Sequence, residues 1–441
     1  MSGTPPGRPG SETGPAQAGP AGPAGTAGDR PPAAAADSVD SADAPAAHYP
    51  VWVSPGVASV GAASLFSDSG HEIATAVFPG FLTGVLHGTA GTLGVIEGLS
   101  DALLGVAKLF GGPLADDPAR RVRLARGGYL LTAVFTAAIG LAAAVWQAGV
   151  LRAAAWVARG IRGPARDTML ADLAPADAYG RSYGLERAGD NLGAVVGPLL
   201  AAVLVATVGT RRAFYVALVP GLFAAASISV AAARASKSVT AARERVRAGF
   251  GALRGTGLAR PLVPVAAFEL GNVATTLLIL RATSLLHTGG RSLTAATTLA
   301  IVIYAGHNAV GAVVALLGGR WIDAASPRQA FAAGAALYLA AYAGFASPVH
   351  SWPLLAVFFC LAGAGIGLAE TAESTLVAQL LPGALRGSGF GVLGGLQSAG
   401  DFLSSAVVGV LYTTVSAAAG FGYAAAWMAV AVLASRLVRT R

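Results

Sequence analysis

The sequence predicts an all-α membrane protein in which twelve transmembrane helices form two pseudo-symmetric six-helix bundles. Three observations carry this prediction: the chain is poor in charge, it contains twelve long apolar stretches, and its second half repeats features of the first. Of its 441 residues, 54% are hydrophobic and only 12% are charged, and the mean hydropathy is +0.62. Soluble domains carry about 25% charged residues, so most of the surface of this chain is expected to face lipid.

Each apolar stretch is long enough to cross a bilayer. A hydrocarbon core of about 30 Å needs roughly 20 apolar residues in a helix. The first six predicted helices cover 55–86, 90–111, 124–147, 149–171, 181–207 and 211–233. The second six cover 261–286, 293–318, 329–347, 352–378, 387–413 and 415–436.

The helices and the segments between them divide the chain into four parts. Residues 1–48 are rich in Pro, Ala, Gly and Ser without apolar periodicity, and a segment of this composition is predicted to be a disordered cytoplasmic tail. The N-terminal bundle occupies 49–233 and the C-terminal bundle 261–441. Between them, 234–260 contains seven Lys and Arg residues and is predicted to be a basic cytoplasmic linker.

The basic residues also predict the orientation of the chain. Loops on the side of the linker are rich in arginine, whereas the opposite loops hold only Arg152, Arg211, Arg212 and Arg291. The positive-inside rule therefore predicts two cytoplasmic termini in a cell inner (plasma) membrane. This placement accounts for the net charge of +8 without a nucleic-acid partner. The expected partners are the lipid bilayer and a small-molecule substrate, and the protein is expected to be monomeric.

The two halves repeat at a constant offset of 207 residues. Gly112-Pro-Leu-Ala-Asp116 aligns with Gly319-Arg-Trp-Ile-Asp323, and Pro175 aligns with Pro382. The same offset aligns Gly180-Arg-Ser-Tyr-Gly184 with Gly387-Ser-Gly-Phe-Gly391. Parallel repeats related by an axis along the membrane normal are a transporter architecture with its binding site near the midplane.

Acidic residues within the apolar stretches indicate a shared polar cavity. Eleven of the 22 Asp and Glu residues fall in or at the ends of these stretches. Each costs about 2.5–3.5 kcal/mol at a lipid-facing midplane position, so most are expected to face one another, basic partners or water. The predicted residues of the proton-coupling and substrate cavity are Asp68, His71, Glu72, Glu97, Asp101, Arg159, Asp190, Glu269, Glu370 and Glu373.

The Asp-x-x-His-Glu cluster of the first helix suggests how a proton is carried. A buried carboxylate binds a proton more readily than a solvated one, and a nearby arginine opposes that binding. Our hypothesis is that Asp68, Glu72 or Glu97 carries the coupling proton and that His71 relays it. The alternative is a fixed ion-pair network that holds the first, second and fourth helices together.

Arginines form a stripe on the fourth helix, where Arg159, Arg162 and Arg166 share one face. Two interpretations of Arg159 stay open. Arg159 either binds an anionic group of the substrate or pairs with Glu97 or Asp101 in gating.

Several motifs resemble those of the major facilitator superfamily over residues 50–436. The segment Gly112-Pro-Leu-Ala-Asp116-Asp-Pro-Ala-Arg120-Arg121 is similar to the signature loop G-x-L-a-D-r-x-G-R-R/K, with Asp117 at its first basic position and Ala119 at its second glycine. Arg159-Gly-Ile-Arg162-Gly163 resembles the fourth-helix motif R-x-x-q-G, whose arginine the family ties to proton coupling. The predicted conformational gate comprises Gly112, Asp116, Arg120, Arg121, Gly319, Asp323, Arg162 and Arg166. In it, Asp116 is expected to pair with Arg120 or Arg121 and to face the positive start of a neighbouring helix.

The fifth helix carries a motif that the family associates with exporters of the antiporter type. Gly193-Ala-Val-Val-Gly197-Pro198 resembles g-x-x-x-G-P, with Ala201-Ala202 in place of its closing glycines. Gly193 and Gly197 lie one turn apart and allow close helix contact, and Pro198 removes a backbone donor. The alternative interpretation is helix packing with no role in the direction of transport.

Together these features predict a secondary active transporter that works by alternating access. Proton-coupled efflux of a small polar or amphiphilic organic compound is the expected function, and proton-coupled import of a polar or anionic metabolite is the alternative. A membrane scaffold or sensor is a third possibility that buried charges on several helices disfavour. No nucleotide loop or metal motif indicates an enzyme. The only cysteine, Cys360, excludes an internal disulfide, and no cofactor is expected, since the proton gradient supplies the energy.

Overall fold

The computed structural model describes residues 52–238 and 250–437, and the described residues are helical with short connections. The predicted tail at 1–48 and the linker residues at 239–249 lie outside them. The all-α prediction is confirmed. The helices of the first half are α1 (Pro55–Gly80, followed by a π-turn at Phe81–Val85), α2 (Ala90–Ala115), α3 (Pro118–Ala138), α4 (Val145–Leu173), α5 (Tyr179–Val208), α6 (Thr210–Val216) and α7 (Leu218–Ser238). Those of the second half are α8 (Ala259–Glu269), α9 (Thr275–Thr288), α10 (Leu293–Ala324), α11 (Pro327–Ala346), α12 (Trp352–Leu380), α13 (Arg386–Thr414) and α14 (Ala417–Leu437).

Helix α3 begins at Pro118 rather than at the predicted 124, because a local capping signal starts it. The Asp117 side chain accepts a hydrogen bond from the Ala119 N–H at 2.9 Å, and proline is favoured in the first turn. The basic residues of the next turns lower the local hydropathy. A reading based on apolar runs therefore places the start too late.

Two predicted helices are interrupted. The predicted helix 211–233 divides into α6 and α7, and the predicted helix 261–286 divides into α8 and α9 at residues 270–274. At the second break the freed backbone groups find side-chain partners: the Val273 N–H donates to Tyr342 Oη at 3.0 Å and the Ala274 N–H to Ser405 Oγ at 2.9 Å. Non-helical backbone at membrane depth is tolerated where the protein supplies such partners.

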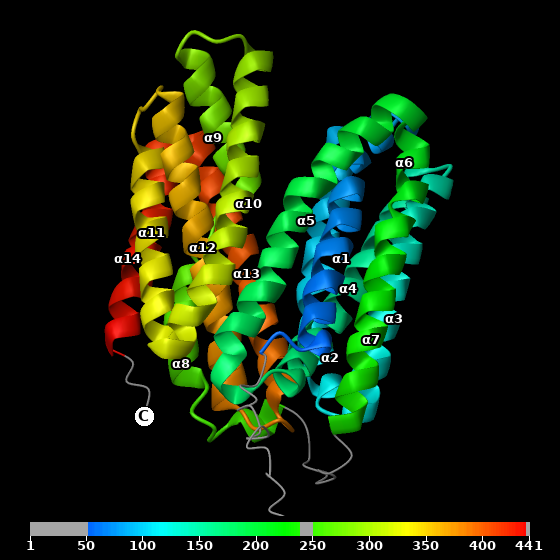
Figure 1. Cartoon of the computed structure of the whole chain (residues 1–441). Helices are drawn as coiled ribbons and strands as arrows, with labels where there is room; N and C mark the ends of the chain where they lie inside the picture. The colour runs from blue at the N-terminus through cyan, green and yellow to red at the C-terminus, as the bar shows by residue number, and fades with distance from the viewer. Residues whose placement is uncertain (1–51, 239–249, 438–441) are drawn as a thin grey trace, which may run out of the picture. The chain divides into compact units, whose positions relative to one another are not determined.

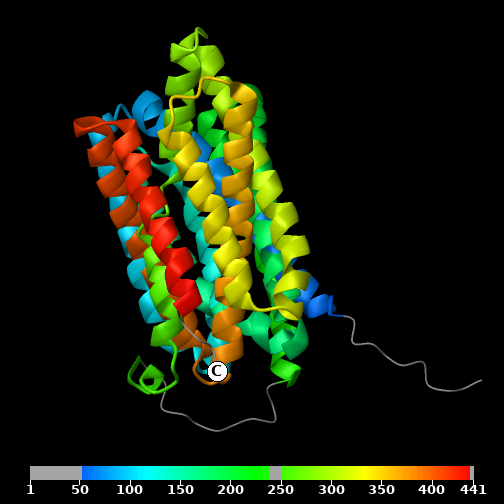
Figure 2. The ribbon, with the colours of Figure 1, turned by 90° about the vertical axis from the view of Figure 1, so that its left-hand side faces the viewer.

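The helices group into two halves within the described residues. Helices α1 to α7 pack on one another, as do α8 to α14, and the halves meet mainly where α5 contacts α10 and α2 contacts α13. In Figure 1 α5 and α10 lie close together near their lower ends and separate toward their upper ends. Figure 2 shows α11, α12 and α14 of the second half running alongside one another.

Among the residues that the structure describes, seven helical stretches are long and apolar enough to cross a membrane by length and composition: Pro118–Leu141, Ala176–Val208, Thr210–Ala235, Leu293–Ala324, Pro327–Ala346, Trp352–Leu380 and Ala417–Arg436. The protein is therefore a multi-pass membrane protein. Helices α2 and α4 carry several of the charged side chains that surround the site described next.

Candidate functional site

A polar cavity of about 210 Å³ lies between the two halves. Its walls come from α2, α4 and α5 on one side and from α8, α12 and α13 on the other, with Asn272 from the break between α8 and α9. The charged residues that line the cavity are Lys108, Arg159, Arg162, Arg166, Asp167, Arg187, Asp190, Glu269, Glu370 and Asp401. Four of the predicted cavity residues, Arg159, Asp190, Glu269 and Glu370, are among them.

The first-half wall is built around an ion pair between α1 and α4. Arg159 Nη2 lies 2.8 Å from Asp68 Oδ1, whereas Arg159 Nη1 has no hydrogen-bond partner in the described part of the chain. Arg159 therefore pairs with the first helix and not, as one interpretation expected, with Glu97 or Asp101. One of its two terminal nitrogens is left free for another acceptor.

The small residues of α5 bring this pair close to the fifth helix. A Cβ added at Gly193 would lie 2.7 Å from the Asp68 Cβ and 2.8 Å from the Leu65 carbonyl oxygen. At Gly197 it would clash with the Glu72 Cβ. The glycines of the predicted packing motif therefore allow α5 to pack closely against the acidic face of α1. Pro198 lies inside α5, which runs on to Val208.

A second cluster in the same wall joins α4 to α5. Arg166 Nη1 lies 2.6 Å from Glu186 Oε1 and 3.5 Å from Asp190 Oδ2, and its Nε lies 2.9 Å from Asp167 Oδ1. Arg162 donates to Ser67 Oγ at 2.6 Å and lies over the Tyr129 ring. The arginine stripe of α4 is thus largely committed to partners of its own half.

Arg187 connects the two halves. Its Nη1 lies 3.4 Å from Asp190 Oδ2 on the same helix and 3.4 Å from Glu370 Oε2 on α12. Its Nη2 donates to Ser374 Oγ at 3.5 Å, also on α12. Arg187 is therefore a basic partner of Glu370 across the two halves, in line with the expectation that the acids within apolar stretches face basic partners.

A matched pair of variants tests this contact. We expect Arg187→Gln to lower the free energy of unfolding by about 3 kcal/mol, because it leaves buried carboxylates without their cation. Adding Glu370→Gln is expected to restore part of this loss, with a coupling free energy of about 1–3 kcal/mol in the double-mutant cycle. Chemical unfolding of the purified protein measures both. Strictly additive effects would mean that the two side chains do not interact.

The second-half wall is acidic. The Asn272 amide donates to Glu269 Oε2 at 3.1 Å and to Asp401 Oδ1 at 2.8 Å, so the helix break ties the two carboxylates together. Lys108 of α2 reaches across the halves and donates to Ser398 Oγ at 3.2 Å, one turn from Asp401. In the described residues the second half contributes no Lys or Arg to the lining of the cavity.

The halves are closed at one end by two equivalent contacts, at what we call the Asp116 end. Asp116 accepts hydrogen bonds from the Ser388 N–H at 2.9 Å and from the Ser388 hydroxyl. Asp323 accepts from the Gly180 N–H at 2.6 Å and the Arg181 N–H at 3.1 Å. The offset of 207 residues that relates Asp116 to Asp323 also relates Arg181 to Ser388, so one contact is the repeat of the other. Each aspartate faces the N-terminal turn of a helix, where the dipole favours negative charge.

Arg120 and Arg121 form their ion pairs with other carboxylates than the predicted Asp116, although Arg121 Nη2 donates to the Asp116 carbonyl oxygen at 3.3 Å. Arg120 is exposed and lies 3.4 Å from Asp117. Arg121 is buried, pairs with Asp172 of α4 and donates to the Ala115 carbonyl oxygen at 2.8 Å. Burial raises the pKa of the Asp116 carboxyl, and the hydrogen bonds from Ser388 counteract part of this rise.

The remaining predicted cavity residues lie outside the cavity lining. Glu97 pairs with Arg152 at 2.7 Å, and Asp101 accepts from Trp156 Nε1 at 2.9 Å, so both belong to the α2–α4 contact. Arg152, expected in a surface loop, is only 1% exposed.

Three more predicted cavity residues, His71, Glu72 and Glu373, do not line the cavity either. The His71 ring packs on the Trp156 ring at a centroid distance of 4.4 Å, and its Nε2 lies 3.9 Å from Glu72 Oε1. Glu373 lies behind the cavity, where its Oε2 accepts from Gln397 Nε2 at 2.8 Å.

The predicted list of cavity residues omits five residues of the site, which are Lys108, Arg187, Asn272, Gln397 and Asp401. For the charged ones a signal exists, since an ionisable residue within an apolar stretch is a candidate functional residue by its cost alone. For Asn272 and Gln397 we find no such signal in the sequence.

Two six-helix halves around a charged cavity, closed at one end by repeated contacts, define a secondary membrane transporter. A family model for the major facilitator superfamily matches residues 60–306, and the chain belongs to this family. An uncharacterized protein of Mycobacterium tuberculosis is 35% identical over 153 residues, which are 35% of this chain and 37% of that protein. The multidrug resistance protein MdtG of Dickeya zeae is 33% identical over 126 residues, 29% of this chain and 30% of that protein. The matched stretches thus span 30% to 37% of the length of these relatives.

Solved structures share the fold over most of the chain. The human organic anion transporter MFSD10 (TETRAN) has a TM-score of 0.66 at 15% identity, covering 86% of this chain and 99% of that one. The fucose:proton symporter FucP of E. coli has a TM-score of 0.68 at 13% identity, covering 87% and 98%. At these identities the likeness shows the fold. The family match makes this chain a transporter and not an enzyme.

Proposed function

We propose that this protein is a proton-coupled exporter of a small polar or amphiphilic organic compound. The observation that carries the proposal is the Asp68–Arg159 pair, in which a carboxylate of α1 holds an arginine that lines the central cavity. The energy source is the proton gradient, and no cofactor takes part. The protein acts as a monomer in the inner (plasma) membrane with both termini in the cytoplasm, and it binds no nucleic acid.

The pair supplies a coupling step because its two states differ in charge. When Asp68 is ionised it holds Arg159, and protonation of Asp68 removes the charge that the guanidinium faces. Arg159 is then free to permit movement of α4 against α1. In export the substrate binds while Asp68 is ionised and leaves when Asp68 is protonated, so the proton and the substrate move in opposite directions across the membrane.

Alternating access follows from the repeated contacts at the Asp116 end. With that end closed, the cavity is available to the opposite side. Breaking the Asp116–Ser388 and Asp323–Arg181 contacts allows the halves to rock and to expose the cavity at the Asp116 end. Under the proposed topology the structure is an outward-facing state.

The charges of the cavity support a polar substrate. Ten of the residues that line it are ionisable, whereas its apolar lining consists of Leu104, Pro164, Phe390, Leu393 and two glycines. The contact of Gly193 and Gly197 with α1 supports export, because the family motif of exporters here packs directly on the coupling pair. The resemblance to MdtG, named a multidrug resistance protein, points the same way.

Import of an anionic metabolite by proton symport is the second candidate. The free Nη1 atoms of Arg159 and Arg162 favour it, since arginine matches carboxylates and phosphates. A relative that is 33% identical over 131 residues is named the cis,cis-muconate transport protein of Acinetobacter baylyi.

The direction of flux separates the two candidates. A screen for ligands that raise the thermal stability of the purified protein first identifies a transported compound, starting with ethidium, cis,cis-muconate and L-fucose. Its accumulation is then measured in everted and right-side-out vesicles under an imposed pH gradient. We expect accumulation in everted vesicles that a protonophore abolishes. Accumulation only in right-side-out vesicles would establish the importer, and flux that ignores the gradient would contradict proton coupling.

A further inference from the structure

A carboxylate of the second half is buried with one of its oxygens lacking a hydrogen-bond partner among the described residues. Glu373 of α12 is 2% exposed, and its Oε2 accepts a hydrogen bond from Gln397. Its Oε1 is buried and has no hydrogen-bond partner among the residues that the structure describes. An ionised carboxylate with one oxygen unsatisfied is costly in such a place, whereas a protonated carboxyl carries no net charge and its O–H can donate to a water.

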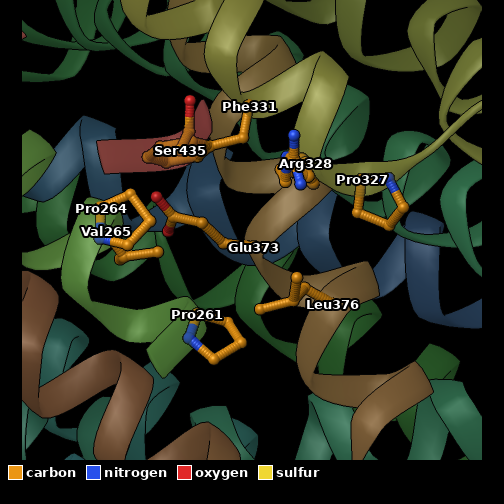
Figure 3. Close-up of a pocket in the computed structure, with 10 residues that line it drawn as sticks. Pro261, Pro264, Val265, Pro327, Arg328, Phe331, Glu373, Leu376 and Ser435 are labelled. Atoms are coloured by element: carbon orange, nitrogen blue, oxygen red, sulfur yellow. The ribbon is translucent and has the colours of Figure 1, made fainter. Parts of the chain in front are cut away.

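A small second cavity is lined in part by Glu373 (Figure 3). Its volume is about 20 Å³, which is room for about one water molecule. Its lining includes Pro261, Val265, Arg328 and Ser435, from the first turns of α8 and α11 and the last turns of α14. Figure 3 shows the Glu373 carboxylate pointing toward Val265 and the neighbouring Pro264. The cavity thus lies among helix ends on the side where α10 ends after Asp323.

On its other side Glu373 adjoins the central cavity, because Gln397, its hydrogen-bond donor, lines that cavity. Glu373 is therefore placed between the central cavity and the small cavity near the Asp116 end, even though the two halves are closed there. The ionisable groups that face it are Glu370 of its own helix, Glu269 of α8, Asp401 of α13, Arg187 of α5 and Arg328 of α11.

We propose that Glu373 is a proton-binding site of the second half, separate from the Asp68–Arg159 pair and reached from the Asp116 end through this small cavity. A proton from water in the cavity forms an O–H bond at the Glu373 carboxylate, which becomes a neutral carboxyl; the reverse step returns the proton to water. A role of this site in driving transport rests on the proposed function, whereas the binding of the proton does not.

The lining selects a proton over a metal ion. A hard cation needs about six or more oxygen ligands, or several waters in their place. The small cavity offers the Glu373 carboxylate and the Ser435 hydroxyl among side chains that are mostly proline, valine, phenylalanine and leucine. The described residues hold no group of three or more His, Cys, Asp or Glu side chains able to bind a metal.

Dicyclohexylcarbodiimide tests the proposal, because it adds to protonated carboxyl groups in apolar surroundings. The full-length protein in lipid vesicles is treated over a series of pH values, and modified peptides are quantified by mass spectrometry. We expect modification at Glu373 at a rate that rises as the pH falls. Absence of modification at every pH, or a rate independent of pH, would overturn the proposal without any variant being needed.

Two matched variants test the route. Val265→Leu fills the small cavity with one extra carbon, whereas Val263→Leu makes the same change on the exposed face of α8, where Val263 is 57% exposed. The route is read by time-resolved infrared spectroscopy, which follows the protonated-carboxyl band of Glu373 after a rapid drop in pH, because dicyclohexylcarbodiimide is too large for the one-water cavity. We expect Val265→Leu to slow the rise of this band by about threefold or more and Val263→Leu to leave it unchanged. Equal rates in both variants would rule out this entry route. Because protonation is read without transport, its outcome is separable from that of the flux assay.

Discussion

Replacing Asp68 with asparagine is expected to abolish transport driven by a pH gradient while sparing exchange of substrate at equal pH. Asparagine keeps the size of the side chain and a hydrogen bond to Arg159, but it neither binds nor releases a proton near neutral pH. The variant therefore loses the two charge states that make the pair a coupling element. We expect gradient-driven accumulation to fall by about tenfold or more, the size of a coupling free energy of 1–3 kcal/mol.

Asp101→Asn is the matched control for this prediction. Asp101 is also an aspartate of the first half, but its carboxylate accepts from Trp156 outside the lining of the central cavity. Gradient-driven accumulation of the compound found in the stability screen is expected to persist in this variant. If the Asp68→Asn protein also accumulates the compound down an imposed pH gradient, the coupling proton is carried elsewhere, and Glu72→Gln is the next variant to measure.

The architecture could be predicted from the sequence because it depends on the apolar composition of the helices and on the repeat between the two halves. Apolar stretches of membrane length locate the helices, and the aligned glycines and aspartates at an offset of 207 residues locate the repeat. The contacts of Asp116 and Asp323 with the starts of α13 and α5 show why those residues repeat: each equivalent pair closes the same gap from opposite halves.

The ion pairs between helices could not be predicted from the sequence in the same way. Helical periodicity tells which charges share a face of one helix, but the partner across a helix contact depends on tilt and register. Arg152 and Arg159 lie two turns apart on α4, and only packing decides that the first meets Glu97 and the second Asp68. The choice of Asp172 rather than Asp116 as the partner of Arg121 has the same origin.

The break between α8 and α9 illustrates a further limit. Residues 270–274 are as apolar as a transmembrane helix requires, apart from Asn272. The helix opens there because distant side chains, Tyr342 and Ser405, replace its lost backbone hydrogen bonds. No local sequence signal indicates hydrogen-bond partners that lie about 70 to 130 residues away in the chain.

Gly180→Val is expected to open the Asp116 end of the protein. A Cβ at Gly180 would lie 2.6 Å from the Gly319 carbonyl oxygen and 2.7 Å from Asp323 Oδ1, so a branched side chain pushes α5 away from α10. Overpacking of this kind costs about 1–3 kcal/mol, which is about a 5- to 150-fold shift between the closed and open states. Gly383→Val is the control, because Gly383 is a glycine near the same end whose added Cβ would meet nothing within 4 Å.

Accessibility of one thiol measures the shift. Gly163 lines the central cavity and has open space for a side chain, so Gly163→Cys in a Cys360→Ala background reports on the cavity. In everted vesicles, which present the Asp116 end under the proposed topology, an impermeant maleimide is expected to label this thiol slowly in the parent and in Gly383→Val, and about tenfold faster in Gly180→Val.

The repeat makes a second variant part of the same prediction. The contact of Gly387 with Gly112 is the repeat of the contact of Gly180 with Gly319. A Cβ at Gly387 would lie 2.6 Å from the Gly112 carbonyl oxygen. Gly387→Val is therefore expected to speed labelling as Gly180→Val does. Unchanged labelling in both would show that the two aspartate contacts hold the end closed without the glycines. If only one variant speeds labelling, then one of the two contacts, α2 with α13 or α5 with α10, can open while the other stays closed. A rocking motion of two rigid halves does not allow this.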